Sequence, residues 1–303
     1  MLHLLRKGVV GATLLALALL AGACGSGDDA DGPTIVVASF NFGESLILGE
    51  IYAQALEDAG YAVERNLGLG SREVVKPALE SGEIGLVPEY TGSLGNFLGV
   101  VPTADEQSTW QEVKDAFEAN GVTLLAYAPA QDKNGFVVTG ETAAALGLAN
   151  VSDLAPHASD LVFGGPPECP ERLNCLPGLE SVYGLVFAEF KPLDVGGPLT
   201  VAALEGGDVD VGVLFTTDGV IAAKGLVLLD DDRGLNPAEN IVPAVRMDIV
   251  DAYGDDFVEL LDGVSAAITT PELTEMNRRA GIDQEDPADI AAQWLSDKGF
   301  VSG

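Results

Sequence analysis

A fifteen-residue pattern that occurs twice constrains the fold more than any other feature of this chain. Residues 78–92 read Ala-Leu-Glu-Ser-Gly-Glu-Ile-Gly-Leu-Val-Pro-Glu-Tyr-Thr-Gly, and residues 203–217 read Ala-Leu-Glu-Gly-Gly-Asp-Val-Asp-Val-Gly-Val-Leu-Phe-Thr-Thr. Each copy predicts a helix that ends at a glycine and a short buried strand after it. Pro88 is expected to end the first strand, because proline has no N–H to donate to a sheet.

Both copies place an aromatic residue and a threonine where the strand ends. Tyr90 aligns with Phe215, Thr91 aligns with Thr216, and Glu89 precedes the first pair. Ligands bind at the carboxyl ends of strands in open α/β sheets. We therefore expect two lobes that face one cleft, each offering an aromatic ring and a hydroxyl to the same small ligand. The alternative is coincidence, since Ala-Leu-Glu-x-Gly is a common helix ending.

Length and charge narrow the class of protein. The 303 residues suit one large or two ordinary domains, and 47% are hydrophobic, which is enough for a sizeable core. The formal net charge of −32 argues against a nucleic-acid partner and against docking on an anionic membrane surface. The acidity either serves solubility or attracts cations.

The N-terminus predicts export and a lipid anchor. Residues 1–23 have the charged start and short apolar run of a signal peptide. The small residues before Cys24 resemble a bacterial lipobox, which predicts lipidation of Cys24; plain secretion after Ala23 is the alternative. Residues 24–33 form a flexible polar tether. We expect the folded part outside the cytoplasmic membrane, held on its outer face by lipid.

This placement bears on Cys169 and Cys175, which lie close together in a proline-rich loop. In an oxidising compartment such a pair predicts a disulfide. No metal site is expected, because the two histidines are His3, inside the signal peptide, and His157.

Two helix starts are expected to face the cleft. Asn41 and Glu44 have the spacing of a capping box, and this helix start either binds an anion or is simply capped. Ser71 is a good N-cap for the next helix. Glu73 stands where a dinucleotide fingerprint needs its third glycine, so this turn does not predict a nucleotide site. No catalytic residue and no cofactor is predicted, because the chain lacks the common nucleophile and metalloprotease motifs.

The rest of the chain predicts two crossings between lobes. A strand at residues 136–139 leads into the second lobe, and residues 240–246 lead back. Helices at residues 257–267, 271–279 and 287–298 are expected to pack on the first lobe.

Several segments together resemble the osmoprotectant-type substrate-binding proteins of ABC importers, which take up glycine betaine, choline, carnitine and related solutes. These are residues 39–44, 48–54, 56–61, 88–92, 176–179, 183–185 and 215–219. The resemblance implies an α/β, two-lobed fold of the periplasmic-binding-protein type II with two crossovers. Lobe 1 would comprise residues 34–135 and 236–303, and lobe 2 residues 136–235. It implies solute binding and delivery to a membrane permease, without enzymatic activity.

The resemblance also implies that aromatic rings bind the quaternary ammonium. Tyr90 matches a tyrosine of the family's cage, Phe136 stands where a tyrosine is common, and Val201 and Glu239 replace two others. Glu239 offers a carboxylate to a cationic or hydroxylated ligand, or it is an exposed hinge residue. The predicted ligand-binding residues are Asn41, Phe42, Glu44, Ser71, Glu89, Tyr90, Thr91, Phe136, Phe215, Thr216 and Glu239.

The expected function is a solute receptor of an ABC importer, for a quaternary ammonium solute of the glycine betaine or choline type. A receptor for a different small polar or aromatic solute is one alternative. A surface lipoprotein without a transport role is the other.

Overall fold

The computed structural model describes residues 32–301. The predicted signal peptide, the predicted lipidation site Cys24 and most of the predicted tether lie outside the described residues. No helix in the described part is both long enough and apolar enough to cross a membrane.

The first body of the molecule is a five-stranded sheet covered by helices. Its strands lie in the order β2-β1-β3-β10-β4. Their bounds are β1 Ile35–Phe40, β2 Val63–Gly70, β3 Leu86–Tyr90, β4 Val122–Leu124 and β10 Ile241–Arg246. The helices of this body are α1 Gly43–Asp58, α2 Arg72–Ser81, α3 Thr91–Leu98, α4 Glu106–Glu118, α9 Met247–Tyr253, α10 Asp255–Ala267, α11 Thr270–Gly281 and α12 Pro287–Lys298. We call it lobe 1.

The second body, lobe 2, has its own five-stranded sheet in the order β7-β6-β8-β5-β9. Its strands are β5 Asn134–Thr139, β6 Val162–Gly165, β7 Glu189–Pro192, β8 Val211–Phe215 and β9 Leu226–Leu228. Its helices are α5 Gly140–Leu146, α6 Leu176–Gly178, α7 Pro198–Gly206 and α8 Val220–Ala223.

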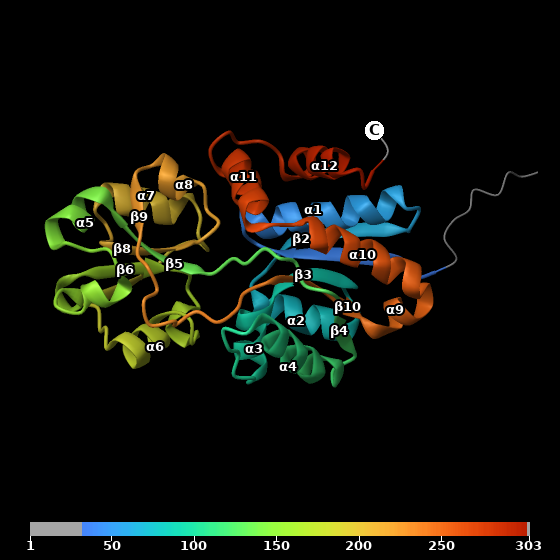
Figure 1. Ribbon diagram of the computed structural model, residues 1–303, viewed down its shortest axis with the longest axis horizontal. Coiled ribbons are helices and arrows are strands. Elements are labelled where there is room, and N and C mark those ends of the chain that lie inside the picture. Colours follow the sequence, from blue (N-terminus) through green and yellow to red (C-terminus); the bar gives the residue numbers. More distant parts are fainter. Residues whose placement is uncertain (1–31, 302–303) are drawn as a thin grey trace, which may run out of the picture.

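The two lobes lie side by side and two segments of chain join them (Figure 1). The first segment leads from β4 into β5, and the second leads from β9 back to β10. β10 runs antiparallel to β3, and β5 runs antiparallel to β8, so each crossing inserts one antiparallel strand into a sheet. The predicted two-lobed α/β fold with two crossovers is confirmed. The residue boundaries proposed for the lobes stay a prediction.

Both copies of the repeated pattern form the local structure expected of them. α2 ends at Gly82 with φ 84° and α7 ends at Gly207 with φ 72°, and both glycines adopt the left-handed conformation of a helix end. The buried strands β3 and β8 follow directly. The C-terminal helices pack on lobe 1 as expected: α12 lies against α1 in Figure 1.

Two local predictions were wrong. Pro88 lies inside β3 and faces Pro243 of β10. β1 pairs with β3 only at Val37 and Leu86, so position 88 has no partner on that side that needs an N–H. The capping box of Asn41 and Glu44 is absent as well: α1 starts after Phe42, whose side chain makes no cap. Glu44 is instead turned toward the lobe interface.

Candidate functional site

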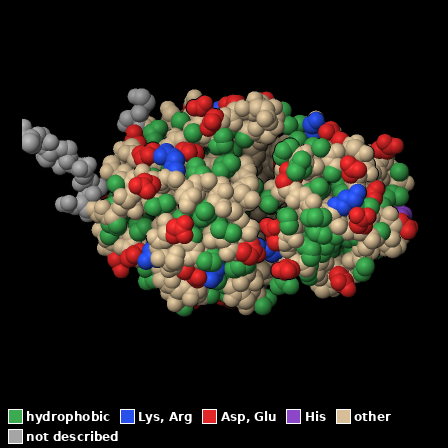
Figure 2. Space-filling view, turned by 180° about the vertical axis from the view of Figure 1, so that it is seen from behind, with side chains coloured by type: hydrophobic (Ala, Val, Ile, Leu, Met, Phe, Trp, Pro, Cys, Tyr) green, Lys and Arg blue, Asp and Glu red, His purple; other side chains and the backbone are tan. Residues whose placement is uncertain are grey.

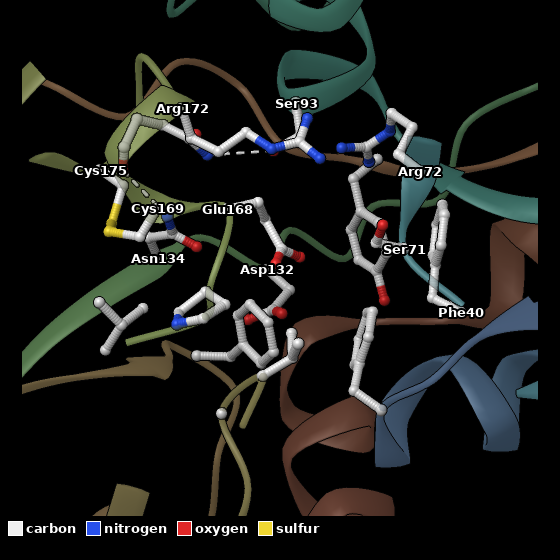
Figure 3. A pocket seen from close by; sticks show the side chains of 18 of the residues that line it. Phe40, Ser71, Arg72, Ser93, Asp132, Asn134, Glu168, Cys169, Arg172 and Cys175 are labelled. Atoms are coloured by element: carbon white, nitrogen blue, oxygen red, sulfur yellow. Dashed lines mark hydrogen bonds between the residues drawn. A yellow bond between two sulfur atoms is a disulfide. The ribbon is translucent and has the colours of Figure 1, made fainter. Parts of the chain in front are cut away.

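A small cavity lies between the lobes and takes its walls from both. Its volume is about 110 Å³. Figure 2 shows the surface hollowed along the boundary between the lobes, and Figure 3 shows the side chains around the cavity. The wall comprises Phe40, Asn41, Phe42, Ser71, Arg72, Tyr90, Ser93, Asp132, Asn134, Pro166, Glu168, Cys169, Arg172, Asn174, Cys175, Val195, Gly196, Val213, Phe215 and Glu239. A wider groove of about 770 Å³ adjoins it and shares Phe42 and Phe215.

Four aromatic rings form one side of the cavity. Phe42 is central: its ring centroid lies 5.1 Å from that of Phe215, 5.9 Å from that of Tyr90 and 6.0 Å from that of Phe40. Phe40 and Tyr90 are the last residues of β1 and β3, whereas Phe215 ends β8 in lobe 2. The carboxyl ends of strands from both sheets therefore bring their rings to one place. Such a wall suits an organic cation, which is attracted to the faces of aromatic rings.

Behind this aromatic wall a buried polar cluster joins the lobes. Glu44 of α1 accepts hydrogen bonds from the Tyr90 hydroxyl at 2.8 Å, from the Thr217 hydroxyl at 2.6 Å and from the Asn277 side-chain amide at 2.6 Å. Thr217 belongs to lobe 2, and the other three residues belong to lobe 1. The cluster thus holds the lobes together and orients the Tyr90 ring.

Two buried carboxyl groups of this cluster, those of Glu44 and Asp132, meet at the Thr217 hydroxyl. The Thr217 Oγ1 atom lies 2.6 Å from Glu44 Oε2 and 2.8 Å from Asp132 Oδ1. A hydroxyl has a single proton, so it can donate to only one of the two carboxyls at a time. Burial raises the pKa of Glu44, and burial together with the nearby charge of Glu44 raises the pKa of Asp132 well above its usual range. Each of these two buried carboxyls therefore titrates in dependence on the other.

The cysteine loop contributes a second set of contacts between lobes. Arg172 forms an ion pair of 2.6 Å with Glu73 and lies over the Phe97 ring at 5.1 Å. The Asn174 amide donates to the Ser93 hydroxyl at 3.1 Å. All three partners belong to lobe 1. The loop therefore reaches across the cavity from lobe 2.

Cys169 and Cys175, joined through their sulfur atoms in Figure 3, delimit this loop. Their Cα atoms lie 5.3 Å apart, which is within the usual range for bridged cysteines. Both cysteines line the cavity.

Charged groups from lobe 1 complete the wall. Arg72 at the start of α2 donates to Glu89 of β3 at 2.8 Å, so two charges that are nearly inaccessible to water offset one another. Glu239 precedes β10 and accepts a hydrogen bond of 2.5 Å from Ser93. Burial raises the pKa of Glu239 to about 7, against the lowering effect of this hydrogen bond.

The structure brings about half of the predicted ligand-binding residues to the cavity. The six that line it are Asn41, Phe42, Ser71, Tyr90, Phe215 and Glu239. Of the two interpretations of Glu239, the one as an exposed hinge residue is wrong, because Glu239 is only 1% exposed. Whether these residues contact a ligand stays a prediction.

Five other predicted residues do not line the cavity. Glu89 lies behind it as the partner of Arg72, and Glu44, the partner of Tyr90, lines the wider groove instead. Thr91 is bound to the backbone of Ala238 and Asn240, and Thr216 is bound to Lys133 and Asp132. Phe136 packs against Phe163 in the core of lobe 2. In each case a protein partner takes the group that was expected to meet the ligand.

Sequence reasoning missed the wall that comes from the crossing segment and from the cysteine loop. Asp132 and Asn134 lie on the segment that enters lobe 2, and Glu168, Arg172 and Asn174 lie in or beside the loop. Polar residues flanking a predicted crossing and a predicted disulfide were an available signal. Arg72, next to the predicted N-cap Ser71, was another.

A cavity between two α/β lobes that two crossing segments join, with aromatic and polar side chains from both lobes, defines the class of a solute-binding protein. The chain belongs to the family described as the substrate binding domain of ABC-type glycine betaine transport systems, whose model matches residues 33–297. Members of this family are binding components of transporters and not enzymes. The chain is therefore the extracytoplasmic solute-binding component of an ABC importer.

Curated relatives agree with this membership, and a solved structure shares the fold. The chain is 30% identical over 278 residues to the glycine-betaine-binding protein of Pseudomonas aeruginosa, covering 88% of each. It is 27% identical over 274 residues to the glycine betaine-binding protein YehZ of Escherichia coli, covering 85% of this chain and 88% of the relative. The crystal structure of a glycine betaine/carnitine/choline ABC transporter matches with a TM-score of 0.70 at 24% identity, covering 89% of this chain and 99% of the other.

Proposed function

We propose that this protein captures a small quaternary ammonium solute in the cavity between its lobes and delivers it to an ABC permease. The observation that supports this most directly is the aromatic wall, to which lobe 1 contributes Phe42 and Tyr90 and lobe 2 contributes Phe215. The cavity of about 110 Å³ is of the order of the ~150 Å³ cavities that hold benzene, which suits a small solute. Relatives named for glycine betaine and carnitine support the same class.

Capture works by hinge closure around the two crossing segments. The bond from Thr217 to Glu44 and the ion pair from Arg172 to Glu73 join lobe 2 to lobe 1. A solute that touches rings from both lobes adds its binding free energy to the closed form only. It therefore shifts the population toward the form that a permease recognises.

The test is a pair of matched substitutions. Phe215→Leu keeps an apolar side chain but removes a ring face from the cavity. Phe190→Leu makes the same change at another half-buried strand position of lobe 2, outside the cavity. We expect Phe215→Leu to weaken the binding of choline or glycine betaine roughly 2- to 30-fold by calorimetry, and Phe190→Leu to leave it unchanged. Equal affinities for both variants and the wild type would contradict a cation–π site.

We further propose that lipid on Cys24 tethers the exported protein to the outer face of the membrane, and that Cys169 and Cys175 form a disulfide there. The spacing of small residues before Cys24 supports the anchor. Cys24→Ser should move the protein from the membrane fraction to the soluble fraction. Persistence in the membrane fraction would contradict lipidation at this residue.

A further inference from the structure

Glu239 lines the cavity and carries an unpartnered buried oxygen. Its Oε1 atom accepts from Ser93, but its Oε2 atom has no hydrogen-bond partner among the described residues. Five buried side-chain polar atoms in that part of the chain lack a partner, and this one alone belongs to a residue that lines the cavity. An unpaired buried acceptor costs free energy, so a ligand that donates to it gains affinity.

Tight packing holds the Glu239 carboxyl in this position. A Cβ atom at Gly92 would lie 3.0 Å from the Glu239 Cδ atom and 2.6 Å from the Ala238 carbonyl oxygen, so glycine at 92 is what allows the close approach. The hydrogen bond from Ser93 fixes the same group from the next residue. The acceptor is therefore preorganised, which lowers the entropic cost of binding a donor.

The two cationic side chains of the wall are already paired. Arg72 lies 2.8 Å from Glu89, and Arg172 lies 2.6 Å from Glu73. Figure 3 shows the two arginines approaching one another near Ser93 from opposite sides of the cavity. Their charges are thus offset by carboxylates of the protein.

Three other carboxyl groups line the cavity: those of Asp132, Glu168 and Glu239. Neither lysine nor histidine occurs among the described lining residues. Because both arginines are offset by carboxylates, the charge around the cavity is negative. A ligand with a net positive charge offsets it, whereas a zwitterion does not.

From the unpartnered Oε2 atom of Glu239 and the negative charge around the cavity, we infer that the cavity selects a cationic quaternary ammonium solute. This solute also carries a hydrogen-bond donor, as choline does. A zwitterion without a donor, such as glycine betaine, leaves both Glu239 Oε2 and the negative charge unmatched. The inference rests on the proposed function and narrows it to one chemical class. Glu239 acts in it as the specificity-determining residue.

Four probes separate the effect of a hydrogen-bond donor on the ligand from the effect of the ligand's net charge. Choline is a cation with a hydroxyl, and propyltrimethylammonium is a cation of the same size without one. Carnitine is a zwitterion with a hydroxyl, and glycine betaine is a zwitterion without a donor. Titration calorimetry of the full wild-type protein at pH 8 should give choline a dissociation constant about 10- to 100-fold lower than those of propyltrimethylammonium and glycine betaine.

Two variants then test which side chain causes the preference for choline. Glu239→Gln should weaken the binding of choline at least tenfold and bring the affinity for choline close to that for glycine betaine. Glu168→Gln removes a carboxylate from the same wall without touching the unpartnered oxygen, and should keep the preference of choline over propyltrimethylammonium. The melting temperature of each variant shows whether it is folded, and the comparison of the four probes needs no variant.

The outcomes separate this inference from the proposed function. If no quaternary ammonium compound binds the wild type, the proposed function is wrong, and the inference with it. If glycine betaine binds as tightly as choline, or choline no tighter than propyltrimethylammonium, the function stands and the inference alone is overturned. A choline preference that survives in Glu239→Gln also overturns it.

Discussion

Glu239→Gln should stabilise the ligand-free protein at alkaline pH but much less at acidic pH. Burial raises the pKa of Glu239 from 4.5 to about 7, and the hydrogen bond from Ser93 lowers it only in part. Between these values the folded protein binds a proton that the unfolded chain has released. The stability contributed by the protonated group is therefore complete below pH 4.5 and is lost as the pH rises toward and through 7.

The size of the effect follows from the two pKa values. Because the pKa rises from 4.5 to about 7, the unfolding free energy is lower by roughly 3 kcal/mol once Glu239 is ionised in both the folded and the unfolded state. Over the range from pH 5 to pH 8, linkage gives a loss of roughly 2.5 kcal/mol in the wild type. The amide of Glu239→Gln does not titrate, so the variant lacks this loss.

Urea unfolding followed by tryptophan fluorescence measures both proteins at pH 5 and pH 8 without ligand. The difference in unfolding free energy between variant and wild type should grow by roughly 2.5 kcal/mol between the two pH values. Titrating groups that do not interact with Glu239 are present in both proteins and cancel. The charge of Glu239 also raises the pKa of Asp132, so its removal lowers that pKa and adds to the difference in the same direction. A difference that stays constant would show that Glu239 ionises in the folded protein as it does in the unfolded chain, and would refute the argument from burial.

Two further predictions concern the cysteine loop. Replacing Cys169 and Cys175 by serine opens a loop with a sequence separation of 6, which should cost about 2 kcal/mol and lower the melting temperature by about 5 °C. Dithiothreitol should lower the wild-type melting temperature to the same value; no effect of the reductant would contradict a disulfide. Arg172→Ala removes the ion pair with Glu73 that joins the lobes, and should weaken solute binding roughly 3- to 10-fold by calorimetry. Arg233→Ala removes an arginine that lies over a ring within lobe 2, so it should leave affinity unchanged, and equal losses in the two variants would contradict closure by the loop.

The repeated pattern carried most of what could be predicted about the fold. Helix-ending glycines such as Gly82 and Gly207 and the apolar runs after them are local signals, because backbone conformation and burial at these positions depend on near neighbours. These signals placed Tyr90 and Phe215 at corresponding strand ends. The rings of both residues line one cavity in the structure.

The same reasoning could not choose which face of a strand meets the cavity. β5 is buried on both faces, so its apolar residues have no alternation that tells one side from the other. Phe136 consequently lies in the core of lobe 2, on the same face of the sheet as Val213, its partner on β8.

The order of helices and strands, the existence of two lobes and the aromatic strand ends were thus determined by the amino-acid sequence itself, through interactions between residues that are near in the chain. The tertiary structure alone decided which polar groups remain available to a solute. Thr91 and Glu89 were taken by partners elsewhere in lobe 1, whereas Glu239 kept one oxygen unpaired. Arg172 and its partner Glu73 are 99 residues apart, and such a pairing exists only once two separately folded bodies have docked.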